Sequence, residues 1–245
     1  MSGCVSLLNV LDVARSLGPD PLRATPELVA NWLLSEYLER TGGGFNYNPA
    51  TNEVPNLFCG RISEEQAVRS CLTRGNPKGR QQNADAIKQV APFAISNIST
   101  CYRIKFAAVS VGRVSGRTIY VAIKAPLVRV QGRNAFVVMP GFRMSHRPME
   151  PEIDVACSIA LASLARGDFA GSDFEYLYAG PGLSGKREFR VIHGKDRRIY
   201  DSNSVDHLLD VYVKGVAIVL ASGRGEARPS LGGYRIIDPD SPSMF

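Results

Sequence analysis

Two arginines and a histidine stand close together immediately before a predicted helix. The segment from Gly141 to Pro148 reads GFRMSHRP and supplies Arg143, His146 and Arg147. Cationic side chains ahead of a helix N-terminus can bind an anion, because the helix dipole places partial positive charge there. The acidic residues at positions 150, 152 and 154 support a second interpretation, a structural salt-bridge cluster with the two arginines.

His146 could also act as a general base. A histidine removes a proton effectively when a carboxylate orients its ring, and Glu152 and Asp154 are the candidates for that carboxylate. Such a pair would suit hydrolysis of a phosphate ester. A single loop histidine is also a common surface or packing residue, so the sequence leaves the catalytic role open.

A second group of carboxylates lies on the later predicted strands. Asp173 and Glu175 project from the same strand face, and Glu188 begins the next strand. Carboxylate oxygens are the ligands that Mg²⁺ prefers, so a hydrolase with this site would use that ion. An exposed acidic strand face explains the same pattern. The histidines and cysteines lack metal-ligand spacing, and we expect no cofactor apart from Mg²⁺ in the hydrolase case.

Basic residues are concentrated in one acid-free part of the chain. No Asp or Glu lies between Asp85 and Glu150, whereas ten Lys and Arg residues do, in a chain with a formal net charge of +6. Segregated charge of this kind attracts polyanions, and nucleic acid is the usual polyanion in a cell. The leading hypothesis is therefore a nucleic-acid-binding protein that contacts the phosphate backbone. The expected contacts are Arg103, Lys105, Lys124, Arg143 and Arg147.

Two further classes of function remain open. One is a phosphoesterase or nuclease-like hydrolase that uses the His146 site or the later carboxylates. The other is a protein-interaction module whose basic surface docks an acidic partner. The sequence does not distinguish DNA from RNA, and it fixes neither the oligomeric state nor whether the protein is an enzyme.

Composition and cysteine usage indicate a soluble cytoplasmic protein. Hydrophobic residues make up 44% and charged residues 21% of the chain, as in an ordinary globular domain. The five cysteines are scattered without CxxC spacing, which favours a reducing compartment. The N-terminus lacks a basic signal region, and the most apolar stretch, residues 211–221, contains Lys214 and is too short to span a bilayer.

The predicted fold is a single α/β (α+β) domain over residues 1–245, with a mainly antiparallel sheet flanked by helices. Residues 1–44 form an N-terminal helical pair, 83–222 the α/β core and 223–245 a C-terminal strap. Helices are predicted over 5–17, 25–40, 63–72, 83–90 and 151–166, and a loop over 45–55. Residues 205–219 suggest a final helix, although Gly215 also allows a strand.

Strand patterns place two hairpins inside the acid-free stretch. One pairs residues 104–111 with 118–123, and the other pairs 128–130 with 135–139. If Val111 pairs with Arg117, Lys105 lies opposite Ile123, and Arg103, Lys105 and Lys124 gather at one sheet end. Further strands are predicted over 174–178, 188–192 and 234–237.

Two patterns bear on nucleotide chemistry. The segment Gly180 to Lys186 matches the GxxxxGK core of a P-loop, but a strand follows it where the motif needs a helix, which favours a hairpin loop. The order helix, three strands, helix, strand over residues 83–178 resembles the core of PD-(D/E)xK nucleases. The resemblance implies Mg²⁺-binding carboxylates on the second and third strands, and those strands hold none here.

Overall fold

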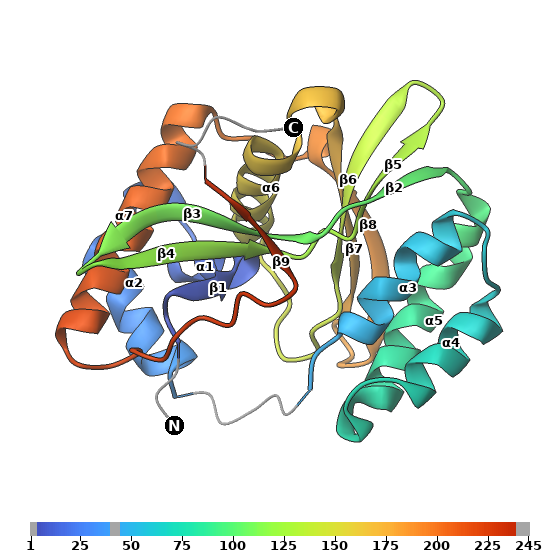
Figure 1. Ribbon diagram of the computed structural model, residues 1–245, viewed down its shortest axis with the longest axis horizontal. Helices are drawn as coiled ribbons and strands as arrows, with labels where there is room; N and C mark the ends of the chain where they lie inside the picture. Colours follow the sequence, from blue (N-terminus) through green and yellow to red (C-terminus); the bar gives the residue numbers. More distant parts are fainter. Residues whose placement is uncertain (1–3, 40–44, 239–245) are drawn as a thin grey trace.

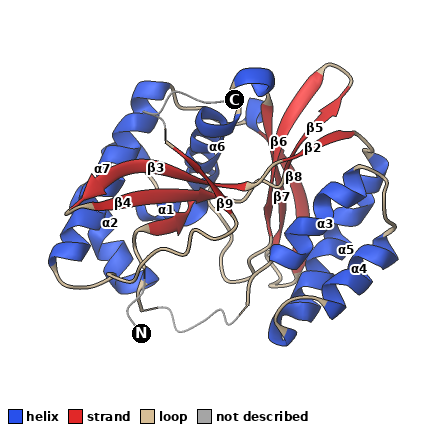
Figure 2. Cartoon of the chain, viewed as in Figure 1, coloured by secondary structure: helices blue, strands red, loops and turns tan. Residues whose placement is uncertain are grey.

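The computed structural model describes residues 4–39 and 45–238, which form seven α-helices and nine strands in two sheets (Figures 1 and 2). The four-stranded sheet has the order β1-β4-β3-β9 and the five-stranded sheet the order β2-β5-β6-β7-β8. The strands are β1 (Leu7–Asn9), β2 (Thr100–Arg103), β3 (Phe106–Val114), β4 (Arg117–Ile123), β5 (Leu127–Gln131), β6 (Asn134–Gly141), β7 (Asp173–Pro181), β8 (Arg187–His193) and β9 (Tyr234–Ile237).

The predicted α/β class is confirmed, but the sheets are mixed rather than mainly antiparallel. β1 pairs with β4, β3 with β9 and β6 with β7 in parallel. The remaining pairs are antiparallel and include the hairpins that the sequence predicted. These parallel pairs join segments that are far apart in the sequence, such as Leu7 with Tyr120 and Phe106 with Tyr234. A local sequence pattern does not predict such a pairing.

The chain changes sheets between β4 and β5. β4 ends at Ile123 and β5 begins at Leu127, so the two predicted hairpins belong to different sheets. Pro126 lies in this connection, and its carbonyl accepts a hydrogen bond from the Ile104 amide at 3.1 Å. This sheet switch separates the strands that the PD-(D/E)xK resemblance would place side by side, so that resemblance does not hold for the observed topology.

The N-terminal helical pair is present as α1 (Val10–Ser16) and α2 (Pro26–Trp32), with a π-helical turn over Leu33–Tyr37. Thr25 caps α2, since its hydroxyl accepts from the Leu28 amide, and Pro26 stands at N1 as predicted. The predicted start of the first helix at residue 5 is wrong, because Leu7–Asn9 pairs with β4. Residues 40–44, where the second helix was expected to end, lie outside the described residues.

Three helices cover one face of the five-stranded sheet: α3 (Asn48–Phe58), α4 (Glu64–Thr73) and α5 (Arg80–Ser96) (Figure 1). The capping box of Ser63 and Gln66 is present at the start of α4. The predicted loop over residues 45–55 is wrong. There the chain folds as α3, because Ala50, Val54 and Leu57 form one buried face against α4 and α5.

The other face of this sheet packs on α6 (Glu150–Leu164), which packs in turn on α1 behind the four-stranded sheet (Figure 1). The four-stranded sheet contributes Val109, Val121 and Ile123 to the same core. α7 (Ser202–Ala221) packs on β3 and α2, which settles the choice between helix and strand for this segment. Among the described residues, no helix combines the length and apolar character that a membrane span needs.

Candidate nucleic-acid interface

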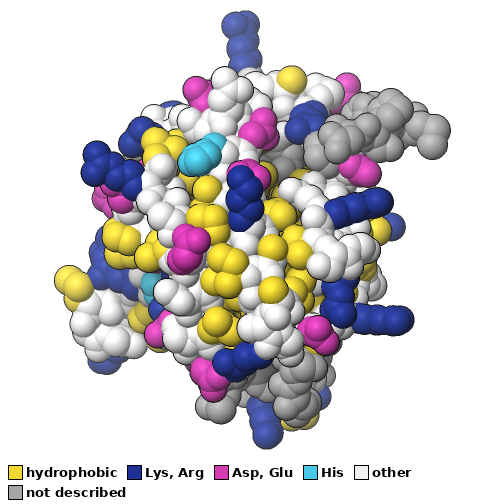
Figure 3. Space-filling model, turned by 90° about the vertical axis from the view of Figure 1, so that its left-hand side faces the viewer, with side chains coloured by type: hydrophobic (Ala, Val, Ile, Leu, Met, Phe, Trp, Pro, Cys, Tyr) yellow, Lys and Arg dark blue, Asp and Glu magenta, His cyan; other side chains and the backbone are white. Residues whose placement is uncertain are grey.

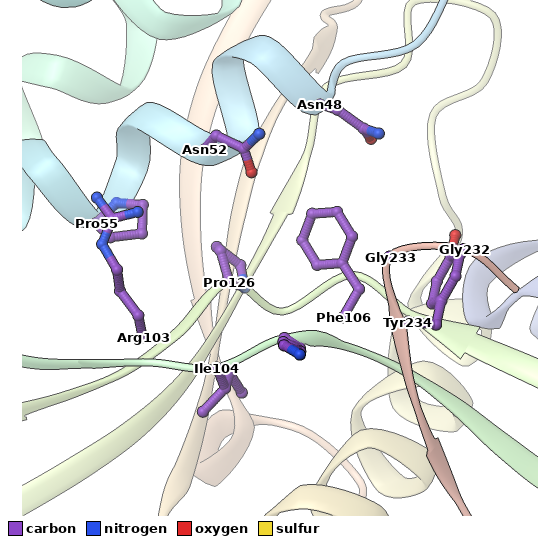
Figure 4. Close-up of a pocket in the computed structure, with 11 residues that line it drawn as sticks. Asn48, Asn52, Pro55, Arg103, Ile104, Phe106, Pro126, Gly232, Gly233 and Tyr234 are labelled. Carbon is purple, nitrogen blue, oxygen red and sulfur yellow. The ribbon is translucent and has the colours of Figure 1, made fainter.

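A pocket of about 320 Å³ opens at the sheet switch (Figure 4). Asn48 and Asn52 project into it from α3, and Phe106 and Tyr234 come from the paired strands β3 and β9. The two rings lie 6.2 Å apart between centroids, and both are half-buried. We call this the switch pocket and define it by Asn48, Asn52, Arg103, Lys105, Phe106 and Tyr234, which all line it.

The charge of the switch pocket is positive. Arg103 and Lys105 line it and are exposed, and no Asp or Glu is among the residues that line it. The Arg103 guanidinium donates to Asn56 Oδ1, and Lys105 has no ion-pair partner in the part of the chain that the structure describes. Both cations therefore remain available to an anionic ligand.

Lys124 stands beside this pocket. Its ammonium group donates to Asn48 Oδ1 at 3.3 Å and lies 5.9 Å from the centre of the Phe106 ring. Burial, followed by repulsion from Arg143, lowers the pKa of Lys124 below the ordinary 10.5, and Asp12 opposes this shift. An anion that binds beside Lys124 would stabilise the charged form of this partly buried lysine, because it would offset the repulsion from Arg143.

Arg103, Lys105 and Lys124 thus come together, but through a different register from the predicted one. Val114 rather than Val111 pairs with Arg117, and Ala107 rather than Lys105 lies opposite Ile123. Arg103 ends β2 of the five-stranded sheet, and Phe106 begins β3 of the four-stranded sheet. The chain therefore also changes sheets between β2 and β3, and Arg103 and Lys105 line the same pocket.

Arg143 pairs with Asp12, not with the acids of α6. Its Nη1 lies 2.7 and 2.8 Å from the two Asp12 oxygens, and the Asp12 side chain is only 5% exposed. Asp12 follows β1, Lys124 follows the parallel strand β4, and Arg143 follows β6. β1 and β4 are parallel, so their carboxyl ends bring Asp12 and Lys124 to one region, and Arg143 reaches the same region from the five-stranded sheet. Open α/β sheets commonly bind ligands at the carboxyl ends of their strands. Arg147 is half-buried and has no ion pair within the described residues.

His146 is held by Glu152, one of its two predicted partners. The His146 Nε2 and Glu152 Oε2 atoms lie 2.6 Å apart, and the side chains are 24% and 1% exposed. The second Glu152 oxygen, Oε1, is buried and has no hydrogen-bond partner among the described residues. Asp154 instead binds Arg197, with Oδ1 at 2.7 Å from Nε.

The later carboxylates do not form one cluster. Asp173 accepts hydrogen bonds from the Phe174 and Lys195 amides, Glu175 binds Arg129, and Glu188 binds Arg190. Glu175 lies opposite His193, whereas Glu188 lies opposite Gly180 at the other end of the β7–β8 hairpin. Over residues 4–39 and 45–238, no three His, Cys, Asp or Glu side chains are grouped to hold a metal ion.

The P-loop-like segment is a hairpin turn, as its context predicted. Gly182 donates its amide to the Lys186 carbonyl at 2.7 Å, and Gly185 adopts a φ of +75°, which closes the turn between β7 and β8. No helix follows Lys186, so a phosphate cradle of the P-loop kind is not formed there.

Neither a protein-family model, nor a curated protein, nor a solved structure matches this chain. The sequence alone did not indicate the contributions of Asn48, Asn52 and Tyr234 to this site. The two asparagines lie in a segment that was predicted to be a loop. Tyr234 lines the site because β9 pairs in parallel with β3 at Phe106, and the local sequence does not predict this pairing.

Proposed function

We propose that this protein binds nucleic acid through the switch pocket and the adjoining Lys124. The observation that carries the proposal is the combination of Arg103 and Lys105 with two aromatic rings in a pocket that no carboxylate lines. Lys124 adds a third cation beside this pocket, near the Phe106 ring. Cationic side chains bind phosphates, and a base can pack against an aromatic face. Small anions would use the cations alone, so the rings favour a nucleotide unit over a simple phosphate.

A single strand suits this site better than a duplex. The pocket has a volume of about 320 Å³, a size suited to one unpaired nucleotide rather than to paired strands. The amide groups of Asn48 and Asn52 offer both donors and acceptors to a base edge. By contrast, the face seen from the α7 side mixes basic, acidic and hydrophobic side chains and presents no uniform positive field (Figure 3).

The test is fluorescence anisotropy with labelled single- and double-stranded DNA and RNA over a salt series. We expect affinity for single strands to fall steeply with salt, because binding releases counterions from the phosphates. The double variant Arg103→Ala/Lys105→Ala should weaken binding about tenfold or more and reduce the salt slope by about two. Arg133 and Lys195 are exposed and do not line the pocket, so Arg133→Ala/Lys195→Ala is the charge-matched control.

Two results would count against the proposal. One is binding that stays flat between low and moderate salt. The other is equal loss of affinity in the pocket variant and in the control, since that would mean the net charge alone attracts the ligand. Co-purification of an acidic protein without nucleic acid would favour the protein-docking hypothesis instead.

A hydrolase is the second candidate, because His146 and Glu152 already have the geometry of a general base and its orienting carboxylate. Loss of cleavage of a labelled oligonucleotide in His146→Ala, with binding retained, would support it. Cleavage that requires Mg²⁺ and is lost in Asp173→Ala would favour the other carboxylates. A cytoplasmic location is part of the proposal and is supported by the odd number of cysteines and their lack of CxxC spacing in the sequence.

A further inference from the structure

We propose that a single strand bound at the switch pocket continues past the start of α3 into a second pocket beside the β7–β8 hairpin. This inference rests on the proposed nucleic-acid binding. The second pocket has a volume of about 470 Å³ and lies between α5, the loop after β6 and the first residues of β8. We call it the hairpin pocket, and Lys88, Lys186 and Arg187 are the lining residues that matter here.

The hairpin pocket carries a net positive charge. Lys88 from α5 and Lys186 from the hairpin turn are exposed, and neither has an ion-pair partner within the described residues. The one carboxylate that lines the pocket, Asp85, accepts a hydrogen bond from Gln81 at 2.8 Å. Together with Arg187, the two lysines outnumber this acid, so the pocket favours an anion such as a backbone phosphate.

Two adjacent residues connect the pockets. Asn48 lines the switch pocket and accepts from Lys124, while Tyr47 precedes it and contacts Arg187 of the hairpin pocket. The Arg187 guanidinium carbon lies 5.7 Å from the centre of the Tyr47 ring, and Nη2 lies 3.4 Å from its hydroxyl. Basic side chains therefore flank the start of α3 on both sides. A polymer of anionic units can place one unit in each of the two positively charged pockets.

The experiment compares oligo-dT strands of increasing length, from two to twelve nucleotides, on the wild type and on Lys88→Ala/Lys186→Ala. We expect wild-type affinity to rise with length and then level off once both pockets are filled. The double variant should bind the shortest strands like the wild type. It should lose about tenfold in affinity for the long strands, and its salt slope should fall by about two. The control Arg133→Ala/Lys195→Ala should follow the wild type at every length.

Different failures point to different conclusions. If Lys88→Ala/Lys186→Ala binds every length like the wild type, the strand does not reach the hairpin pocket, and the second site is refuted while the switch pocket stands. If that variant loses short and long strands equally, the two lysines act only as general charge, which also overturns the inference. If no strand binds the wild type, the proposed function itself fails, and this inference fails with it.

Discussion

Arg129 of β5 and Glu175 of β7 form a buried bidentate ion pair on the five-stranded sheet. Nη2 of the arginine lies 2.6 Å from Oε1 of the carboxylate and Nε lies 2.7 Å from Oε2, and the side chains are 2% and 0% exposed. The rings of Phe58 and Phe136 lie 5.1 and 4.5 Å from the guanidinium carbon. Arg129 belongs to the acid-free stretch, yet it contributes to the core and not to the basic surface.

Removing one partner of this pair should destabilise the protein strongly. Glu175→Ala leaves a buried guanidinium without its counter-charge, and we expect the free energy of unfolding to fall by about 3–5 kcal/mol. The paired substitution Arg129→Met/Glu175→Leu removes both charges and should recover most of this loss. Urea unfolding gives the free energies of unfolding of the wild type, of Glu175→Ala and of the double variant. A double variant as unstable as Glu175→Ala would show that the ion pair itself, not the unpaired charge, decides the stability.

The buried Tyr212 should make the protein less stable at high pH. Burial is the main cause that raises the pKa of Tyr212 well above the ordinary 10.0. The unfolded chain therefore releases this proton near pH 10 while the folded chain keeps it, so the stabilisation is complete below pH 10 and declines as the pH rises above it. In Tyr212→Phe the decline of the unfolding free energy with pH should be shallower. Urea titrations across this range measure it.

The exposed Tyr102 provides the control for this measurement. Tyr102 is 50% exposed, so Tyr102→Phe should leave the alkaline slope unchanged. Tyr176 is also buried with a raised pKa, and it should preserve part of the slope in Tyr212→Phe. An identical slope in wild type and Tyr212→Phe would refute the assignment.

The lowered pKa of Lys124 should also make ligand binding depend on pH. Because burial and Arg143 lower its pKa below 10.5, Lys124 should lose its charge, and with it part of the attraction for phosphate, at a lower pH than an ordinary lysine. Affinity for single strands should therefore begin to decline at a lower pH than titration of an ordinary lysine would give. Lys124→Arg keeps its charge over this range and should flatten the decline. Anisotropy titrations over pH at constant salt test this, and equal profiles for both proteins would contradict it.

Local sequence signals predicted much of the secondary structure. The capping box of Ser63 and Gln66, the Thr25–Pro26 helix start and both hairpins of the acid-free stretch are present as expected. Each of these depends on neighbours within a few residues, where side-chain chemistry and backbone geometry are directly coupled. The pairing of His146 with Glu152 was within reach for the same reason, since the two are six residues apart.

Features that depend on distant contacts were not predictable in this way. The segment around Asn48 resembled a loop, yet Asn83 secures the start of α3, since its Oδ1 accepts from the Ala50 amide and its Nδ2 donates to the Asn46 carbonyl. Asp12 gave no sign of its pairing with Arg143, 131 residues away. Tertiary contacts of this kind override local propensity, and one sequence does not reveal them.

Gly215 allows a final test of how tertiary packing controls a local choice. The sequence left residues 205–219 open between helix and strand because of this glycine, and the structure shows it inside α7 at the contact with α2. A Cβ at Gly215 would lie 2.5 Å from a Val29 methyl carbon and 2.9 Å from the Pro26 carbonyl oxygen. Gly215→Ala should therefore lower the free energy of unfolding by about 1–2 kcal/mol, because an overpacking cost of about 2–3 kcal/mol exceeds the gain of about 1 kcal/mol in helix propensity. Gly232→Ala, where a Cβ meets nothing within 4 Å, is the matched control and should be near neutral in thermal and urea unfolding. A stabilised Gly215→Ala would mean that α2 and α7 do not pack this closely.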